Sequence, residues 1–133
     1  MRLSLDHVAI RVNDLDRTLG FYRRYFGFVQ FDSLDEPPEG KEVHLRSGDV
    51  HLEVFLVKDS AKKSDQGTIG KNDPGVCHFC FNVDHIENIY TRMKDDAIPV
   101  TLELTNVTLN SGKKAKFFFF RDPDDAVVEV LEG

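Results

Sequence analysis

The two halves of the sequence predict the same order of secondary-structure elements, and this duplication limits the folds that the chain can adopt. Each half predicts a strand, an amphipathic helix and three further strands. The first module covers about residues 1–57 and the second about residues 75–133. Because one helix covers only one face of its sheet, each module keeps an open face. Two tandem βαβββ modules therefore predict an α+β fold in a single domain, residues 1–133.

The first module opens with an alternating strand at residues 6–12. Its valine and isoleucine side chains share one face, whereas His7 and Arg11 share the other. Asp14 is a typical helix cap, and the helix after it carries an apolar stripe of Leu15, Leu19, Tyr22 and Phe26. We expect this stripe to cover the valine face, which leaves His7 on the open face.

A histidine and a glutamate recur at matching places in the two modules. His7 and His78 lie in the middle of each first predicted strand, and Glu53 and Glu129 in the middle of each last one, all on the open faces. One such residue alone is most often ordinary, but a pair repeated in register indicates a common role. We expect the modules to close a half-barrel in which the four side chains converge. Buried carboxylates need a compensating charge, which a divalent metal would supply.

The segment between the modules, residues 58–74, is polar and poor in apolar side chains. It predicts a linker or, as the less favoured alternative, a lid. The next predicted strand, residues 75–83, contains Cys77 and Cys80. Residues three apart in a strand point to opposite faces, so we expect two reduced thiols, with Cys80 on the side of His78 and Cys77 on the covered face.

The other predicted elements follow local signals. Asp84, with Glu87 three residues later, predicts a capping box at the start of the second helix. Residues 35–40 predict a loop, and Pro99 predicts an edge position for its strand. The remaining strands are expected at residues 27–31, 42–46, 50–57, 98–102, 115–121 and 126–131.

Several further side chains keep two interpretations. His51 shares the Glu53 face and either supports the metal ligands from behind or is exposed or faces the substrate, which is the favoured alternative. His44 and Arg46 either contact an anion or belong to the solvated surface, which is the favoured alternative. Three phenylalanines either line an apolar pocket or belong to the ordinary core: Phe55, Phe118 and Phe120.

Composition excludes some classes of function. A hydrophobic fraction of 41% is enough for a packed core, and a formal net charge of -6 argues against a nucleic-acid binder. The sequence shows neither a signal peptide nor a membrane span, so we expect a cytoplasmic protein that does not bind membranes.

Three stretches resemble motifs of the vicinal oxygen chelate superfamily. Residues 7–12, followed by Phe21-Tyr22 and Gly27, resemble its opening motif, and residues 75–84 resemble the opening of its second module. Residues 118–124, followed by Val128-Glu129-Val130, resemble its closing motif, although Asp125 stands where a turn glycine is usual. The resemblance covers about residues 3–132. The superfamily includes glyoxalase I, methylmalonyl-CoA epimerase, extradiol dioxygenases and fosfomycin- and bleomycin-resistance proteins.

The resemblance favours the glyoxalase I-like, or lactoylglutathione lyase-like, branch. It implies His7, Glu53, His78 and Glu129 as ligands of a divalent metal ion (Ni, Co, Zn or Mn), with Glu129 and Glu53 as the catalytic carboxylates. Arg11 matches an arginine that lies near a substrate carboxylate. The implied reaction converts a thiol hemithioacetal of a 2-oxoaldehyde, such as methylglyoxal with glutathione, to a 2-hydroxyacyl thioester through a metal-bound enediolate. A homodimer is also implied.

Other members of the superfamily remain alternatives. Methylmalonyl-CoA epimerases usually carry glutamine where Glu53 stands, and Fe(II) ring-cleaving dioxygenases need only two histidines and one glutamate. A non-catalytic small-molecule binding or resistance protein often lacks the metal ligands, so the complete set at His7, Glu53, His78 and Glu129 counts against that class.

Overall fold

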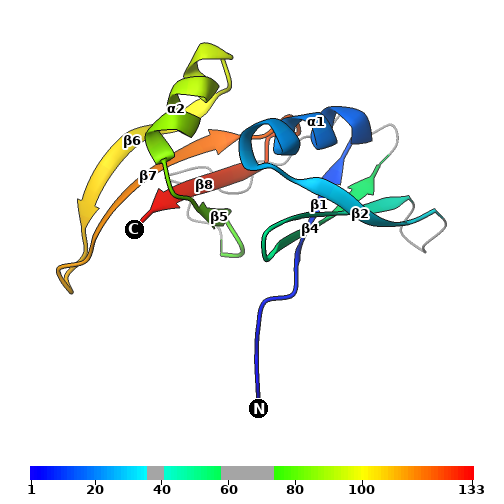
Figure 1. Ribbon diagram of the computed structural model, residues 1–133, viewed down its shortest axis with the longest axis horizontal. Helices are drawn as coiled ribbons and strands as arrows, with labels where there is room; N and C mark the ends of the chain where they lie inside the picture. The colour runs from blue at the N-terminus through cyan, green and yellow to red at the C-terminus, as the bar shows by residue number, and fades with distance from the viewer. Residues whose placement is uncertain (36–40, 58–73) are drawn as a thin grey trace. The chain divides into compact units, whose positions relative to one another are not determined.

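The computed structural model describes residues 1–35, 41–57 and 74–133 (Figure 1). The chain divides into two compact units, Met1–Lys63 and Ser64–Gly133. The described part of each unit has one four-stranded sheet and one helix, which confirms the predicted α+β fold of tandem βαβββ modules. The predicted linker or lid, apart from Pro74, and the predicted loop beyond Asp35 lie outside the described residues.

The two units share one topology. The first contains β1 (Val8–Val12), α1 (Leu15–Phe26), β2 (Val29–Leu34), β3 (Glu42–Ser47) and β4 (Val50–Leu56). The second contains β5 (Phe79–Asn82), α2 (Ile86–Asp95), β6 (Val100–Thr108), β7 (Lys114–Arg121) and β8 (Val127–Glu132). The sheet orders are β1-β4-β3-β2 and β5-β8-β7-β6, with the first and last strand of each module paired in parallel. This pairing places the first strand, which follows the histidine, beside the strand that carries the glutamate.

Local signals explain where α1 begins and ends. Asp14 Oδ1 accepts a hydrogen bond from the Arg17 backbone N–H at 3.0 Å, and Gly27 ends the helix with a left-handed φ of 68°. The buried residues are Thr18, Tyr22 and Tyr25, so the buried stripe shares only Tyr22 with the predicted one. Thr18 tolerates burial because its hydroxyl donates to the Asp14 carbonyl oxygen at 3.0 Å.

Each core lies on one face of its sheet. In the first unit Leu45, Leu52 and Val54 are fully buried, and strand alternation turns the intervening Glu53 to the other face. In the second unit Val128 and Val130 are fully buried on either side of Glu129. The alternation that builds each core therefore also presents one glutamate on the opposite face of each last strand.

The cap of α2 differs from the prediction. Asp84 and Glu87 form no capping box, and the N-cap residue His85 makes no side-chain cap hydrogen bond. Instead, Glu132 Oε2 accepts hydrogen bonds from the backbone N–H groups of His85, at 3.1 Å, and Ile86, at 2.8 Å. A carboxylate from the end of β8 thus satisfies the helix start, a contact between residues far apart in the sequence.

Several strand boundaries also differ from the prediction. β1 begins at Val8 and β5 at Phe79, so His7 and His78 lie immediately before their strands rather than in the middle. β6 continues to Thr108, beyond the predicted end at residue 102, because β7 pairs with it along its whole length. β6 is an edge strand of its sheet, as expected from Pro99 just before it. Neither described helix is long and apolar enough to cross a membrane.

Candidate metal centre

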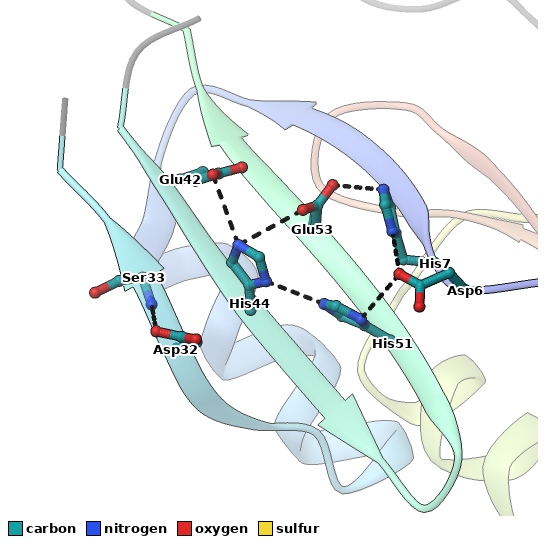
Figure 2. Close-up of polar contacts among 8 residues, drawn as sticks. All are labelled: Asp6, His7, Asp32, Ser33, Glu42, His44, His51 and Glu53. Carbon is teal, nitrogen blue, oxygen red and sulfur yellow. Dashed lines mark hydrogen bonds and ion pairs between the residues drawn. The ribbon is translucent and has the colours of Figure 1, made fainter. Parts of the chain in front are cut away.

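The first unit brings His7 and Glu53 together (Figure 2). Glu53 lies in β4 opposite Ala9 of β1, and His7 precedes that strand by one residue. His7 Nε2 lies 2.5 Å from Glu53 Oε2, and both side chains are partly buried. The predicted pair in this module is therefore a direct contact.

The second unit repeats the arrangement with His78 and Glu129. Glu129 lies in β8 opposite Cys80 of β5, so in both units the glutamate pairs with the residue two positions after the histidine. His78 Nε2 lies 3.0 Å from Glu129 Oε2. Phe119 of β7 packs edge-on against the His78 ring at a centroid distance of 4.9 Å, which fixes the plane of the imidazole.

The donor atoms of each pair fit a divalent metal ion. Two ligand atoms about 2.1 Å from one ion lie about 3.0 Å apart when the ligand–metal–ligand angle is a right angle. The 3.0 Å between His78 Nε2 and Glu129 Oε2 matches this separation. The 2.5 Å between His7 Nε2 and Glu53 Oε2 is shorter, so these two side chains would move slightly apart to bind an ion. Each unit offers one imidazole nitrogen and one carboxylate oxygen, a donor set that suits first-row divalent ions.

The residue before each histidine contacts its other ring nitrogen. Asp6 Oδ2 lies 2.7 Å from His7 Nδ1, and this hydrogen bond raises the pKa of His7 and lowers the pKa of Asp6. Cys77 Sγ lies 3.2 Å from His78 Nδ1. Cys77 was expected on the covered face, but it precedes β5 and is exposed, so strand alternation does not govern it. Such contacts orient a ligating imidazole through its second nitrogen.

Both cysteines are free thiols, as expected. Cys80 lies opposite Glu129, which confirms its predicted face. Partial burial of the thiol, together with the neighbouring Glu129 carboxylate, raises the pKa of Cys80 to about 12.

The first unit also contains polar groups that the sequence analysis treated as surface. His44 of β3 lies opposite Glu53, and its side chain is only 20% exposed. His44 Nδ1 lies 3.2 Å from His51 Nε2, and His51 Nδ1 lies 4.0 Å from Asp6 Oδ2. We call the connected set the histidine cluster (Figure 2): Asp6, His7, Glu42, His44, His51 and Glu53. The hairpin turn after β3 sets this register, so it was the sequence signal that could have paired His44 with Glu53.

The structure decides between the two interpretations of the phenylalanines in β7. Phe118 and Phe120 are fully buried in the core, where Phe118 packs on Tyr90 of α2 at 5.2 Å. Phe119 lies opposite Glu129 and is the aromatic residue beside the second ligand pair. The alternation of β7 explains this burial, since the residues that flank Phe119 must face the opposite side.

The other candidates lie on the open face of the first sheet. Arg11 of β1 is exposed and lies opposite Phe55 of β4. Phe55 is two residues after Glu53, so the two side chains share one face of β4. Arg46 is exposed, and its guanidinium lies over the Phe31 ring at 5.2 Å. Phe31 lies 5.0 Å from the His51 ring, so this aromatic residue borders the histidine cluster. Its role was missed because β2 is irregular between Gln30 and Asp32, where simple alternation fails.

Comparisons with known proteins agree with this fold. Residues 4–130 match the family model of the Glyoxalase/Bleomycin resistance protein/Dioxygenase superfamily. The chain is 27% identical to a lactoylglutathione lyase of Schizosaccharomyces pombe, over 96% of this chain but only 47% of that protein. It is 28% identical to a human mitochondrial methylmalonyl-CoA epimerase, over 97% of this chain and 73% of that protein.

A solved structure supports the same grouping. The glyoxalase family protein from Enterococcus faecalis superposes with a TM-score of 0.73 at 25% sequence identity, covering 97% of each chain. The repeated βαβββ topology, the two His–Glu pairs and the match over residues 4–130 lead to one conclusion. The chain belongs to the Glyoxalase/Bleomycin resistance protein/Dioxygenase superfamily.

Proposed function

We propose that the chain is a metal-dependent lyase or isomerase of the glyoxalase I type. Its substrate would be the hemithioacetal of a 2-oxoaldehyde and a thiol such as glutathione, and its product a 2-hydroxyacyl thioester. The observation that carries this proposal is the His–Glu contact repeated in the same register in both units. The similarity to a lactoylglutathione lyase supports it, although the chain spans about half the length of that protein.

The proposed ligands are His7, Glu53, His78 and Glu129, taken two from each unit. A nickel, cobalt, zinc or manganese ion held there would act as a Lewis acid and stabilise negative charge on the substrate oxygens. His7 and His78 would bind as neutral imidazoles, oriented by Asp6 and Cys77 at their Nδ1 atoms. Convergence of the four ligands in a half-barrel is part of this proposal.

Glu129 is the better candidate for the base that moves the proton. Glu53 has polar neighbours at both oxygens, because His7 lies 2.5 Å from Oε2 and His44 lies 3.6 Å from Oε1. Glu129 instead has Phe119 opposite it, next to His78. A carboxylate beside one imidazole rather than two is freer to turn towards a C–H bond. Glu129 would take the proton from one substrate carbon and return it to the adjacent one, with Glu53 mainly a ligand.

Arg11 is the proposed anchor for a substrate carboxylate. Arg11 is exposed on the same face of the sheet as Glu53. It follows Ala9 by two residues in β1, and Ala9 is the residue that pairs with Glu53 of β4. A guanidinium at that position can form two parallel hydrogen bonds with a carboxylate of the thiol cosubstrate. Arg11→Gln should therefore raise KM for glutathione adducts more than it lowers kcat.

The test is turnover of methylglyoxal plus glutathione by protein reconstituted separately with nickel, cobalt, zinc or manganese. Glu129→Gln should lower kcat at least about 100-fold, because it removes the proton-transferring carboxylate. Metal content should be measured on the same samples, and Glu103→Gln, on the exposed surface of β6, serves as the control. Full turnover by metal-loaded Glu129→Gln would contradict the mechanism, and absence of turnover with every metal would contradict the substrate.

A second candidate is acyl-CoA epimerisation. It is favoured by the similarity to the human methylmalonyl-CoA epimerase, of which the chain spans 73%. Both reactions remove a proton from a carbon next to a thioester or carbonyl group, so Glu129 would serve either one. Exchange of the methylmalonyl-CoA α-hydrogen with deuterated solvent, in the absence of glutathione activity, would select the epimerase.

Two further expectations belong to this proposal. A homodimer is expected, which would allow one site to take ligands from units of two chains. Sedimentation in the analytical ultracentrifuge measures the mass of the protein in solution and so tests this expectation. A cytoplasmic location remains a prediction, and it would supply the reduced thiol that the reaction needs.

A further inference from the structure

The histidine cluster contains a second group of metal-ligand atoms beside the proposed His7–Glu53 pair. Glu42, His44 and Glu53 each offer one donor atom, and these atoms all lie within 4.8 Å of one another. His44 Nε2 lies 3.7 Å from Glu42 Oε1 and 3.6 Å from Glu53 Oε1 (Figure 2). The three residues come from the paired strands β3 and β4, so the group lies wholly within the first unit.

These separations fit ligands around an ion better than hydrogen bonds. A contact of 3.6 Å is too long for a hydrogen bond. Two ligand atoms about 2.1 Å from one ion lie about 3.4 Å apart when they point to two corners of a tetrahedron. The atoms His44 Nε2, Glu42 Oε1 and Glu53 Oε1 are therefore gathered at ligand spacing without bonding one another.

Burial gives an independent reason for a cation at this place. The Glu42 side chain is only 10% exposed, and its ion-pair partner among the described residues is His44, at 3.7 Å. A carboxylate removed from water at that distance from its partner keeps much of its desolvation cost. A divalent cation between Glu42, His44 and Glu53 would offset this cost.

The neighbouring His51 prepares His44 for this role. Its Nε2 lies 3.2 Å from His44 Nδ1, which leaves the His44 Nε2 atom facing the two carboxylates. An imidazole ligand that is held at its second nitrogen in this way keeps its orientation.

The second unit shows that the fold does not require these polar groups. The residue opposite Glu129, equivalent to His44, is Phe119, and the residue equivalent to Glu42 is Phe117. The residue equivalent to His51 is Val127. The same topology and the same His–Glu pair thus form with apolar neighbours, which makes the Glu42–His44 group specific to the first unit.

We propose that the first unit binds a second divalent cation through Glu42 Oε1, His44 Nε2 and Glu53 Oε1. Glu53 Oε2 faces His7, so its carboxylate would bridge this cation and the one held with His7. Two carboxylates and one imidazole suit manganese, zinc or iron(II). A bridging Glu53 is fixed by both ions, and this leaves Glu129 as the mobile carboxylate. The second site does not depend on which reaction the protein catalyses.

The test is the number of Mn²⁺ ions bound per chain, measured by calorimetric titration and elemental analysis of the dialysed full chain. Mn²⁺ is chosen because it prefers oxygen and imidazole ligands to the thiols of Cys77 and Cys80. Wild type should bind two ions, and His44→Phe, which copies Phe119, should bind one. Glu42→Gln should also bind one, and it is the second variant if His44→Phe does not fold.

A matched variant separates this site from the proposed catalytic centre. His78→Ala removes a ligand of the other pair only, so it should lose the ion held with His7 and keep the ion at His44. Electron paramagnetic resonance of wild type should show spin coupling between two Mn²⁺ ions about 3.5–4 Å apart, lost in His44→Phe. One ion per chain in wild type that both His44→Phe and Glu42→Gln retain, or two ions in both variants, would overturn the proposal whatever the activity.

Discussion

At the scale of single residues, equivalent glutamates have different surroundings. Glu53 faces His7 and His44, whereas Glu129 faces His78 and lies beside Phe119 and Cys80. The sequence predicts both His–Glu pairs from strand alternation, which places the two glutamates, although His7 and His78 lie one residue before their strands. It does not predict their neighbours, because those depend on strand pairing and on how deeply each group is buried. His44 is the example, since alternation alone made it a surface residue.

Cys80 provides a test of the Glu129 environment. Burial and the Glu129 carboxylate raise its pKa to about 12 from an ordinary 9.0, so its thiolate fraction should keep rising throughout the alkaline range. In metal-free Cys77→Ser protein, alkylation of Cys80 by iodoacetamide should accelerate about tenfold per pH unit from about pH 7 to about pH 11. Mass spectrometry of the modified peptide gives the rate.

The control for this profile is Glu129→Gln in the same Cys77→Ser background. Removing the negative charge should move the alkylation profile of Cys80 to lower pH, because that carboxylate is one cause of the raised pKa. A profile that levels off near pH 9 in the parent protein would show that Cys80 has an ordinary pKa.

At the scale of elements, local sequence signals were reliable only where the partner residues are close in the chain. Asp14 caps the start of α1 and Gly27 caps its end, as their residue types predict. The start of α2 carries a similar local signal in Asp84 and Glu87, but Glu132 supplies the acceptor. Glu87 instead pairs with Lys116 of β7. Pairing between β5, β8 and β7 decides both contacts, and a single sequence does not reveal such distant partners.

Glu132 should therefore stabilise α2 from outside the helix. Glu132→Ala removes the acceptor for two backbone N–H groups at the helix start and should lower the free energy of unfolding by about 1 kcal/mol. Glu132→Gln keeps one acceptor oxygen and should lose less. Equilibrium urea denaturation measures both variants, and an Asp84→Ala loss larger than that of Glu132→Ala would restore the capping box as the true cap.

At the scale of the whole molecule, the duplication is the feature that the sequence predicts best. Two units with one topology and one His–Glu register follow from the repeated hydrophobic pattern. The histidine cluster of the first unit and the phenylalanines of the second then make two similar sheets chemically different. This division would give one unit the larger share of metal ligands and the other an apolar wall beside its glutamate.

If one ion takes ligands from both units, as proposed, it should couple them, and hydrogen exchange can detect that coupling. Binding of Zn²⁺ should slow amide exchange in α2 of the second unit, because the ion binds only when both of its ligand pairs are folded. His7→Ala, a change in the first unit, should abolish this slowing, whereas His44→Phe should preserve it, since it leaves His7, Glu53, His78 and Glu129 in place. Exchange is followed by mass spectrometry of peptides covering Ile86–Asp95. If slowing of α2 survives His7→Ala, the two pairs hold separate ions and the shared four-ligand site is wrong.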